Sequence, residues 1–380
     1  MLTARFYPVL GGTEKQALSL AKQHRSTGVE VTVVTARLPG LKRKEHVDNI
    51  PVERLFSVFK GRFGSLLFMA SATLYLWRRK EDYDLIHVYL AGSPGVTAGY
   101  IARRLKKKVI LKFGGAGRTG DIGTSAKAPW GQWKLDFLKQ NVHAFVVPSW
   151  DVKKELLDSG FPEEKIILIP NGVDTGVFQP ADEGKKANRR AELKLPAGPL
   201  VIYHGRLEEG KGLEVLLSAW EEVYKQFPDA HLALVGAGNL RSRLQAGLAG
   251  KPHQGQVLFV ASTDRVEAYL QAADIFVLPS LAEGLSNALL EAMSSGLAVV
   301  ASEIGSNCAV VVNSVNGLLA VPGDAHALAR KIIFLLHTPA EQRRLGAAAR
   351  LTITDNYSIE NISGKYQEIY HQLRERGSVA

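Results

Sequence analysis

The sequence contains almost no cysteine: Cys308 is the single one in 380 residues. One cysteine excludes an internal disulfide framework and a cysteine-based zinc site, and we expect Cys308 to be a small packed residue. Long apolar runs are also missing. No stretch approaches the ~20 residues of a membrane-spanning helix, and the first residues hold no apolar segment of signal-peptide length. These absences predict a cytoplasmic protein.

Acidic residues are scarce in the first half of the chain. Residues 1–180 contain 27 Lys and Arg against 16 Asp and Glu, whereas the remainder contains 20 against 21. This asymmetry indicates that one side of the molecule meets an anionic surface, and nucleic acid, anionic lipid and phosphorylated substrates all stay open. The alternative is a soluble basic face without a partner.

Short Val- and Ile-rich runs alternate with helical patterns along the whole chain. Examples are "VEVTVVTA", "DLIHVYLA", "KVILKF" and "AFVVPS", and later "LVIYHG", "AHLALVG", "VLFV", "IFVLPS" and "AVVAS". Unbroken apolar strands separated by amphipathic helices predict parallel sheets buried on both faces. The length suits two doubly wound α/β domains, with the cleft between them as the default site. The polar, proline-containing segment Asp174–Pro199 is typical of a linker.

One helical segment, Ser65–Trp77, is apolar for 13 residues and is flanked by Lys and Arg. It is too short to span a bilayer. It fits either a buried core helix of the first domain, which we favour, or a helix lying in a membrane interface.

Two strand-to-helix turns carry residues suited to binding anions. Gly11 and Gly12 open a helix, where backbone N–H groups can approach a ligand closely. In "YHGRLEEGKGLEVLL", the strand ends at Gly205, and Arg206 and Lys211 follow in a glycine-containing loop. Two fixed cations at the end of a strand suit a diphosphate, although solvated loop cations would give the same pattern.

A third turn, "LVGAGNLRSRL", only partly matches a dinucleotide-binding fingerprint. It offers Gly236 and Gly238, but Arg241 occupies the place of the third glycine. We therefore interpret it as an ordinary turn, which counts against an NAD(P)-dependent dehydrogenase.

The fourth turn places two carboxylates around the start of a helix. In "LAEGLSNALLEAMSSG", Ser286 or Asn287 can cap a helix that begins near Ala288. Glu283 then lies in the preceding loop and Glu291 lies within the helix. Such a pair suits the two ends of an extended ligand better than the carboxyl pair of a glycoside hydrolase, which flanks a single bond.

"GRLEEGKG" and "PSLAEGLSNALLEAMSSGLAVVAS" resemble the donor-site motifs of family 4 glycosyltransferases. The likeness extends over nearly the whole chain, through "GGTEKQALSLAKQHRSTGVEVTVVT", "YDLIHVYLAG" and "IPNGVD". The resemblance implies two facing Rossmann-like domains, the architecture called GT-B, with the active site in the interdomain cleft. It implies an acceptor-side domain at 1–178, a donor-binding domain at 185–356, and a last helix, 357–380, that packs back on the first domain.

The resemblance also implies roles for single residues. Arg206 and Lys211 would bind the donor's diphosphate, and Glu283, the first glutamate of the E-x7-E motif, would face the transferred sugar. Glu291, the second glutamate, would bind the ribose. The remaining donor-binding positions would be Gly205, Gly284, Leu285, Ser286 and Asn287, and Gly11 and Gly12 would form the loop that closes over the reaction centre.

Three features depart from the family pattern or need a separate interpretation. The loop "LKFGGAGRTGD" has no histidine where many family members carry one near the acceptor. We interpret His87, in the preceding strand, as structural. The "DYD" at Asp82–Asp84 resembles a metal-binding D-x-D motif, but it leads directly into a strand, so we discount it.

These observations predict a retaining glycosyltransferase that moves a sugar from a nucleotide-diphosphate sugar to a hydroxyl acceptor in cell-surface polysaccharide or glycolipid biosynthesis. No cofactor, divalent metal or nucleic acid is expected. The acceptor would be a sugar or a lipid-linked molecule, and the basic first domain would allow peripheral contact with the cytosolic face of an anionic membrane. The alternatives are a non-catalytic nucleotide-sugar-binding protein and an NAD(P)-dependent dehydrogenase.

Overall fold

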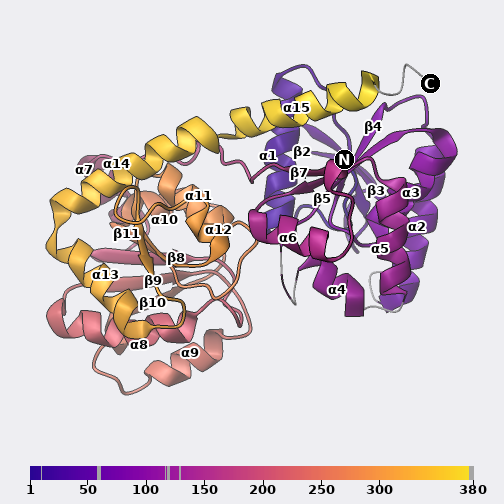
Figure 1. Cartoon of the computed structure of the whole chain (residues 1–380). Coiled ribbons are helices and arrows are strands. Elements are labelled where there is room, and N and C mark those ends of the chain that lie inside the picture. The colour runs from indigo at the N-terminus through magenta and orange to yellow at the C-terminus, as the bar shows by residue number, and fades with distance from the viewer. Residues whose placement is uncertain (10, 58–60, 116, 118–119, 128–129, 376–380) are drawn as a thin grey trace. The chain divides into compact units, whose positions relative to one another are not determined.

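The computed structural model describes residues 1–9, 11–57, 61–115, 117, 120–127 and 130–375 (Figure 1). The chain forms two compact units. The first comprises Met1–Gly172 together with Ile359–Ala380, and the second comprises Val173–Ser358. The structure therefore divides the chain near residues 172 and 358. The sequence analysis ended the first domain at 178, began the second at 185 and began the last helix at 357. Each unit is described by itself.

The first unit is a mostly parallel sheet that packs against helices. Its strands are β1 (Val33–Ala36), β2 (Lys44–Val47), β3 (Ile50–Leu55), β4 (Leu85–Tyr89), β5 (Lys108–Lys112), β6 (Ala144–Val147) and β7 (Ile166–Leu168). Its helices are α1 (Gly12–Ser26), α2 (Gly61–Arg78), α3 (Ser93–Leu105), α4 (Asp121–Lys127), α5 (Gly131–Asn141), α6 (Trp150–Asp158) and α15 (Ile359–Glu375), with a 3₁₀ turn at Glu163–Lys165.

Its strands form two ladders, β2-β3-β1 and β4-β5-β6-β7, which Leu2 joins. The backbone of Leu2 forms parallel bridges to both Val34 and Val88. The expectation of parallel strands is wrong for one pair, because β2 and β3 form an antiparallel hairpin. Its two turn residues, Asp48 and Asn49, both have positive φ, as a two-residue hairpin turn with the right twist requires.

The last helix, α15, packs on the first unit. Ile362, Tyr366 and Ile369 of α15 share a buried cluster with strand residues such as Ile110 and Val146. A polar network fixes the same helix, because the Tyr370 hydroxyl of α15 lies 2.8 Å from His87 Nδ1 and 3.1 Å from His24 Nε2. His87 is thus buried against α15.

Helix α2 contains the apolar segment Ser65–Trp77. Phe68, Ala72 and Leu76 are buried in the core of the first unit, as the core-helix interpretation predicts. The opposite side of α2 is also apolar but exposed: Leu66 is 62% exposed and Trp77 is 46% exposed. The helix is therefore a core helix on one side only. Among the described residues, no helix is long and apolar enough to cross a membrane.

The second unit contains one six-stranded parallel sheet in the order β10-β9-β8-β11-β12-β13. The strands are β8 (Leu200–His204), β9 (His231–Val235), β10 (Val257–Val260), β11 (Ile275–Leu278), β12 (Ala298–Ser302) and β13 (Leu318–Ala320). The helices are α7 (Glu183–Glu192), α8 (Leu213–Gln226), α9 (Arg241–Leu248), α10 (Val266–Ala272), α11 (Asn287–Ser294), α12 (Gly305–Cys308), α13 (Ala325–His337) and α14 (Pro339–Asn356), with a 3₁₀ turn at Gln254–Gln256. This strand order is that of a Rossmann fold, whose topological switch point lies between its first and fourth strands, here β8 and β11.

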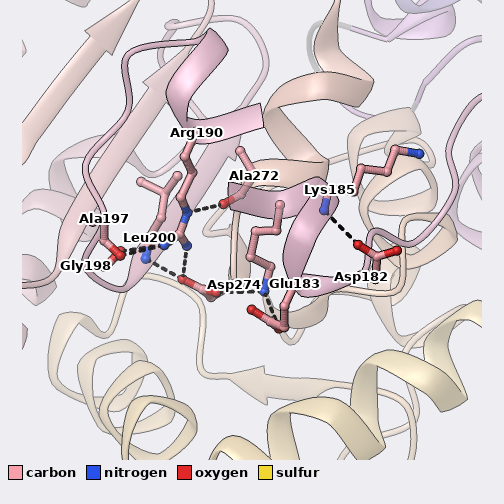
Figure 2. Close-up of polar contacts among 10 residues, drawn as sticks. Asp182, Glu183, Lys185, Arg190, Ala197, Gly198, Leu200, Ala272 and Asp274 are labelled. Carbon is pink, nitrogen blue, oxygen red and sulfur yellow. Dashed lines mark hydrogen bonds and ion pairs between the residues drawn. The ribbon is translucent and has the colours of Figure 1, made fainter. Parts of the chain in front are cut away.

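The prediction that Asp174–Pro199 is a linker is wrong for the central part of this segment. It contains α7, which the Asp182 side chain caps and which packs on α10 (Figure 2). The Asp274 carboxylate accepts hydrogen bonds from Arg190 (2.6 Å), Lys186 (3.0 Å) and the Leu200 backbone N–H (2.7 Å). The basic residues of this polar segment thus anchor a helix of the second unit.

Cys308 also differs from the expectation. It ends the short helix α12 and is exposed instead of packed. The apolar residues that follow it, Val310 and Val311, are buried in its place.

Candidate functional site

The switch point of the second sheet brings together the exit loops of β8, β9 and β11. A Cβ on Gly236 would lie 1.9 Å from the Gly205 carbonyl oxygen, and one on Gly212 would lie 2.0 Å from that of Pro279. Only glycine allows backbones to approach this closely. The Leu281 N–H also donates to the Gly210 carbonyl over 2.9 Å. The glycines of the "GAG" turn thus pack one loop on another, which agrees with its interpretation as an ordinary turn.

Lys211 and Glu283 meet at this edge of the sheet. The Lys211 ammonium lies 2.6 Å from Glu283 Oε1, and the Ser280 hydroxyl donates to the same oxygen over 2.8 Å. The two charged side chains are only 18% and 13% exposed. The pair therefore holds a cation and a carboxylate in fixed, partly desolvated positions, where electrostatic interactions are stronger than in water.

The loop after Glu283 leads into α11 as the sequence predicts. Ser286 is the N-cap, and its hydroxyl accepts from the Leu289 N–H. Leu285 is buried, Gly284 is partly exposed, and Asn287 is the first residue of the helix. The N-terminus of α11 thus lies directly after Glu283 in the chain, and such helix ends favour anions.

Glu291 lies in the second turn of α11 and is buried. Its Oε2 is 2.9 Å from Nε2 of His204, the last residue of β8. Sequence reasoning missed His204 and also Ser280, the partner of Glu283. Their signal was present, since both are polar residues at or just beyond the carboxyl end of a buried strand at the switch point.

Arg206 is not brought to the Lys211–Glu283 pair. Its side chain is 70% exposed and forms an ion pair of 2.6 Å with Glu208. The preceding residue, Gly205, has a positive φ of 151°. The structure therefore brings one of the two predicted cations into a fixed contact and leaves the other at the surface of the same loop.

In the first unit, Gly11 is the N-cap of α1 and Gly12 is its first residue, as predicted. The Glu14 carboxylate lies against Gly11, where an added Cβ would be 2.3 Å from Oε2. Burial raises the pKa of the Glu14 carboxyl above its usual value. The N-terminal end of α1 is therefore next to a carboxyl group, which belongs to Glu14 in the first turn of the same helix.

A second partly buried carboxyl that sequence reasoning missed is Asp121, the first residue of α4, directly after the histidine-free loop that follows β5. Asp121 accepts hydrogen bonds from the N–H groups of Gly114 (2.6 Å) and Ala91 (3.1 Å), at the carboxyl ends of β5 and β4. Burial raises its pKa, while these hydrogen bonds act in the opposite direction. Asp82 of the "DYD" motif pairs with Arg79 instead of joining a ligand set. The described residues contain no group of three or more side chains suited to a metal ion.

Comparisons with known proteins agree with this arrangement. The model of the family described as "Glycosyl transferases group 1" matches residues 184–352, and that of "Glycosyltransferase Family 4" matches residues 10–177. Phosphatidyl-myo-inositol mannosyltransferase of Mycolicibacterium smegmatis is 26% identical, covering 98% of this chain and 92% of that protein. Sulfoquinovosyl transferase of Arabidopsis thaliana is 31% identical over 70% of this chain, and the match spans about half (52%) of its length.

Among solved structures, HepE of Anabaena in complex with UDP-glucose superposes with a TM-score of 0.81 at 18% identity, over 98% of this chain and 99% of that one. This likeness shows the fold. Together with the two family matches, it establishes that the chain belongs to the family 4 glycosyltransferases and is a glycosyltransferase of GT-B architecture.

Proposed function

We propose that this enzyme transfers a sugar from a nucleotide-diphosphate sugar to a hydroxyl acceptor with retention of anomeric configuration. The observation that carries the proposal is the Lys211–Glu283 pair at the switch point, with 2.6 Å between Nζ and Oε1. A fixed cation beside a fixed carboxylate suits a ligand in which an anionic diphosphate adjoins a neutral, hydroxyl-rich sugar.

In this reaction, the enzyme must stabilise the negative charge that develops on the departing nucleoside diphosphate. Lys211 and the N-terminus of α11 are preorganised against that charge. Arg206, exposed on the same loop, adds a second cation when it turns from Glu208 to the phosphate. These groups supply positive charge from the chain itself, so the proposal requires no divalent metal.

Glu283 orients and polarises the donor sugar in this proposal and does not attack it. Its carboxylate is already held by Lys211 and Ser280, so its position is fixed before the donor binds. The acceptor hydroxyl attacks the face that the phosphate leaves, and a phosphate oxygen takes its proton. This route needs no nucleophile-and-base pair from the chain.

The donor and acceptor classes take their support from the relatives. HepE binds UDP-glucose, which supports a nucleotide-sugar donor. The name of the mycobacterial relative includes a phosphatidyl lipid, which supports a lipid-linked or sugar acceptor in glycolipid or polysaccharide biosynthesis.

Helix α2 supports peripheral contact with an anionic membrane. Phe63, Leu66, Leu74 and Trp77 are spaced three, eight and three residues apart, which places them on one face of α2, and they are 66%, 62%, 50% and 46% exposed. Residues 78–80 at its end are exposed cations. An apolar stripe beside Lys and Arg fits the interface of an anionic bilayer.

The donor is tested by thermal shift with UDP, GDP, ADP and their sugars, followed by turnover assays and NMR of the product anomer. We expect one nucleoside diphosphate to stabilise the protein and the corresponding nucleotide sugar to be turned over. The transferred sugar should keep its anomeric configuration in the product. Binding without turnover across a wide acceptor panel would support a non-catalytic binder instead, and an inverted anomer would refute retention.

Membrane contact is tested by sedimentation with phosphatidylcholine vesicles with and without phosphatidylglycerol. The protein should sediment only with the anionic vesicles, and Leu66→Glu should abolish this. Leu351→Glu is the matched control, because Leu351 is equally exposed (62%) but lies on α14 of the second unit. Equal sedimentation of both variants would contradict the role of α2.

A further inference from the structure

His204 and Glu291 form a buried pair at the switch point. His204 ends β8 and Glu291 lies on α11, so the pair joins the strand and the helix that border the predicted donor site. The residues are 8% and 7% exposed. His204 Nε2 lies 2.9 Å from Glu291 Oε2, although the angle of approach departs from that of a good hydrogen bond.

The surroundings make each residue dependent on the other. Within the described part of the chain, neither Nε2 nor Oε2 has a hydrogen-bond partner, so each atom has only the other within ion-pair distance. A buried carboxylate without a partner is strongly unfavourable, and the imidazole nitrogen at ion-pair distance is the group placed to offset that cost. His204 also lies near the Phe276 ring of β11, with 5.9 Å between ring centroids. His204 is therefore buried beside both a ring of the neighbouring strand and the carboxylate.

We propose that His204 is a positioning residue that holds Glu291 in place to read the ribose of the donor nucleotide. This inference rests on the proposed function, in which Glu291 binds the ribose. His204 restrains Oε2 from the sheet side and leaves the other carboxylate oxygen to accept from a ribose hydroxyl. Without this restraint, the carboxylate is free to rotate away, and ribose recognition is lost while the diphosphate contacts of Lys211 remain.

The stereochemistry of two amide side chains gives a matched pair of variants. In His204→Gln, the amide nitrogen lies at about the reach of imidazole Nε2 and can still donate to Oε2. In His204→Asn, the amide nitrogen corresponds to Nδ1 and falls short of the carboxylate. Both variants keep a polar amide at the end of β8, so their effects on folding are comparable.

The test is calorimetric titration of UDP and 2′,3′-dideoxy-UDP, or of the GDP or ADP pair if the donor screen selects that base. In the wild type, the dideoxy nucleotide should bind about tenfold more weakly or worse, the range for a hydrogen bond to a charged group. His204→Gln should keep this ratio, and His204→Asn should reduce it to about twofold.

The outcomes separate the inference from the proposed function. If His204→Asn weakens both nucleotides equally and keeps the ratio, His204 has only a structural role and the inference is wrong, while the proposed function stands. If the wild type binds UDP but does not discriminate against the dideoxy form, Glu291 does not read the ribose and the inference fails with that assignment. If the wild type binds no nucleoside diphosphate, the proposed function itself fails.

Discussion

Replacing Lys211 by alanine should reduce turnover strongly and leave the fold intact. In the structure, Lys211 Nζ is 2.6 Å from Glu283 Oε1 and its side chain is 18% exposed, so its charge is partly desolvated and fixed. A unit charge about 4 Å from the leaving phosphate at an effective dielectric constant of about 20 contributes about 4 kcal/mol. Removal of one preorganised donor to a developing anion typically costs about 10²- to 10³-fold in kcat. This loss in kcat corresponds to about 2.7–4 kcal/mol, which agrees with the electrostatic energy.

The assay is steady-state release of the nucleoside diphosphate from its sugar and the acceptor, with circular dichroism and thermal unfolding to check the fold. Lys251→Ala is the matched control, because Lys251 also forms an ion pair in the second unit, with Glu221 at 3.4 Å, but is 45% exposed. The control should retain full activity. A Lys211→Ala variant that keeps kcat within about twofold of the wild type would refute the role of Lys211 in stabilising the leaving group.

Three further perturbations test the structure around the site. Asp274→Ala should destabilise the second unit by about 3 kcal/mol, because it removes the carboxylate that pairs with the mostly buried Arg190 and leaves Lys186 only the exposed Glu183 as an ion-pair partner. Thermal unfolding should show little change for Glu183→Ala, whose side chain is 90% exposed. Burial lowers the pKa of His24 to about 4, so the folded state resists its protonation. The unfolded chain binds more protons below the unperturbed value of about 6.5, so His24 alone should lower the free energy of unfolding by about 2 kcal/mol between about pH 7.5 and pH 5. Burial lowers the pKa of His87 and His143 in the same direction, so urea unfolding should show at least this loss, and a constant free energy of unfolding would contradict it. Gly212→Ala should abolish nucleotide binding in calorimetry, because its Cβ would overlap a carbonyl oxygen of the β11 exit loop. Gly247→Ala, on α9 of the same unit, meets no atom within 4 Å and replaces a glycine without a positive φ, so it should bind nearly normally.

The sequence predicted the longer apolar strands and missed the three-residue strands β7 and β13, which are also apolar. All the runs quoted as strands, such as "LVIYHG" and "IFVLPS", contain strands of the two sheets. The hairpin of β2 and β3 was not predicted, because "KEHV" is polar and partly exposed and its hydrophobic pattern is therefore weak. Its turn, Asp48–Asn49, was the available signal. Helix α7 was mistaken for a linker because its stability depends on ion pairs to Asp274, which no local pattern reveals.

The same division between local and distant information applies to the site. The loop position of Glu283, the cap at Ser286 and the helical position of Glu291 follow from one contiguous stretch, and the structure agrees with each. The partners of these residues come from other strands. That Lys211 pairs with Glu283, and His204 with Glu291, depends on β8 and β11 being neighbours in the sheet. The expectation that the active site lies in the cleft between the domains stays a prediction.

The central claim is that the carboxyl edge of the second sheet grips the diphosphate of a nucleotide sugar. The most direct test is calorimetric titration of wild type and Lys211→Ala with UDP, GDP and ADP and with the corresponding nucleosides. One nucleoside diphosphate should bind the wild type, and Lys211→Ala should weaken it at least about tenfold while leaving the weaker nucleoside binding unchanged. Equal affinity of wild type and variant for the diphosphate would contradict the claim.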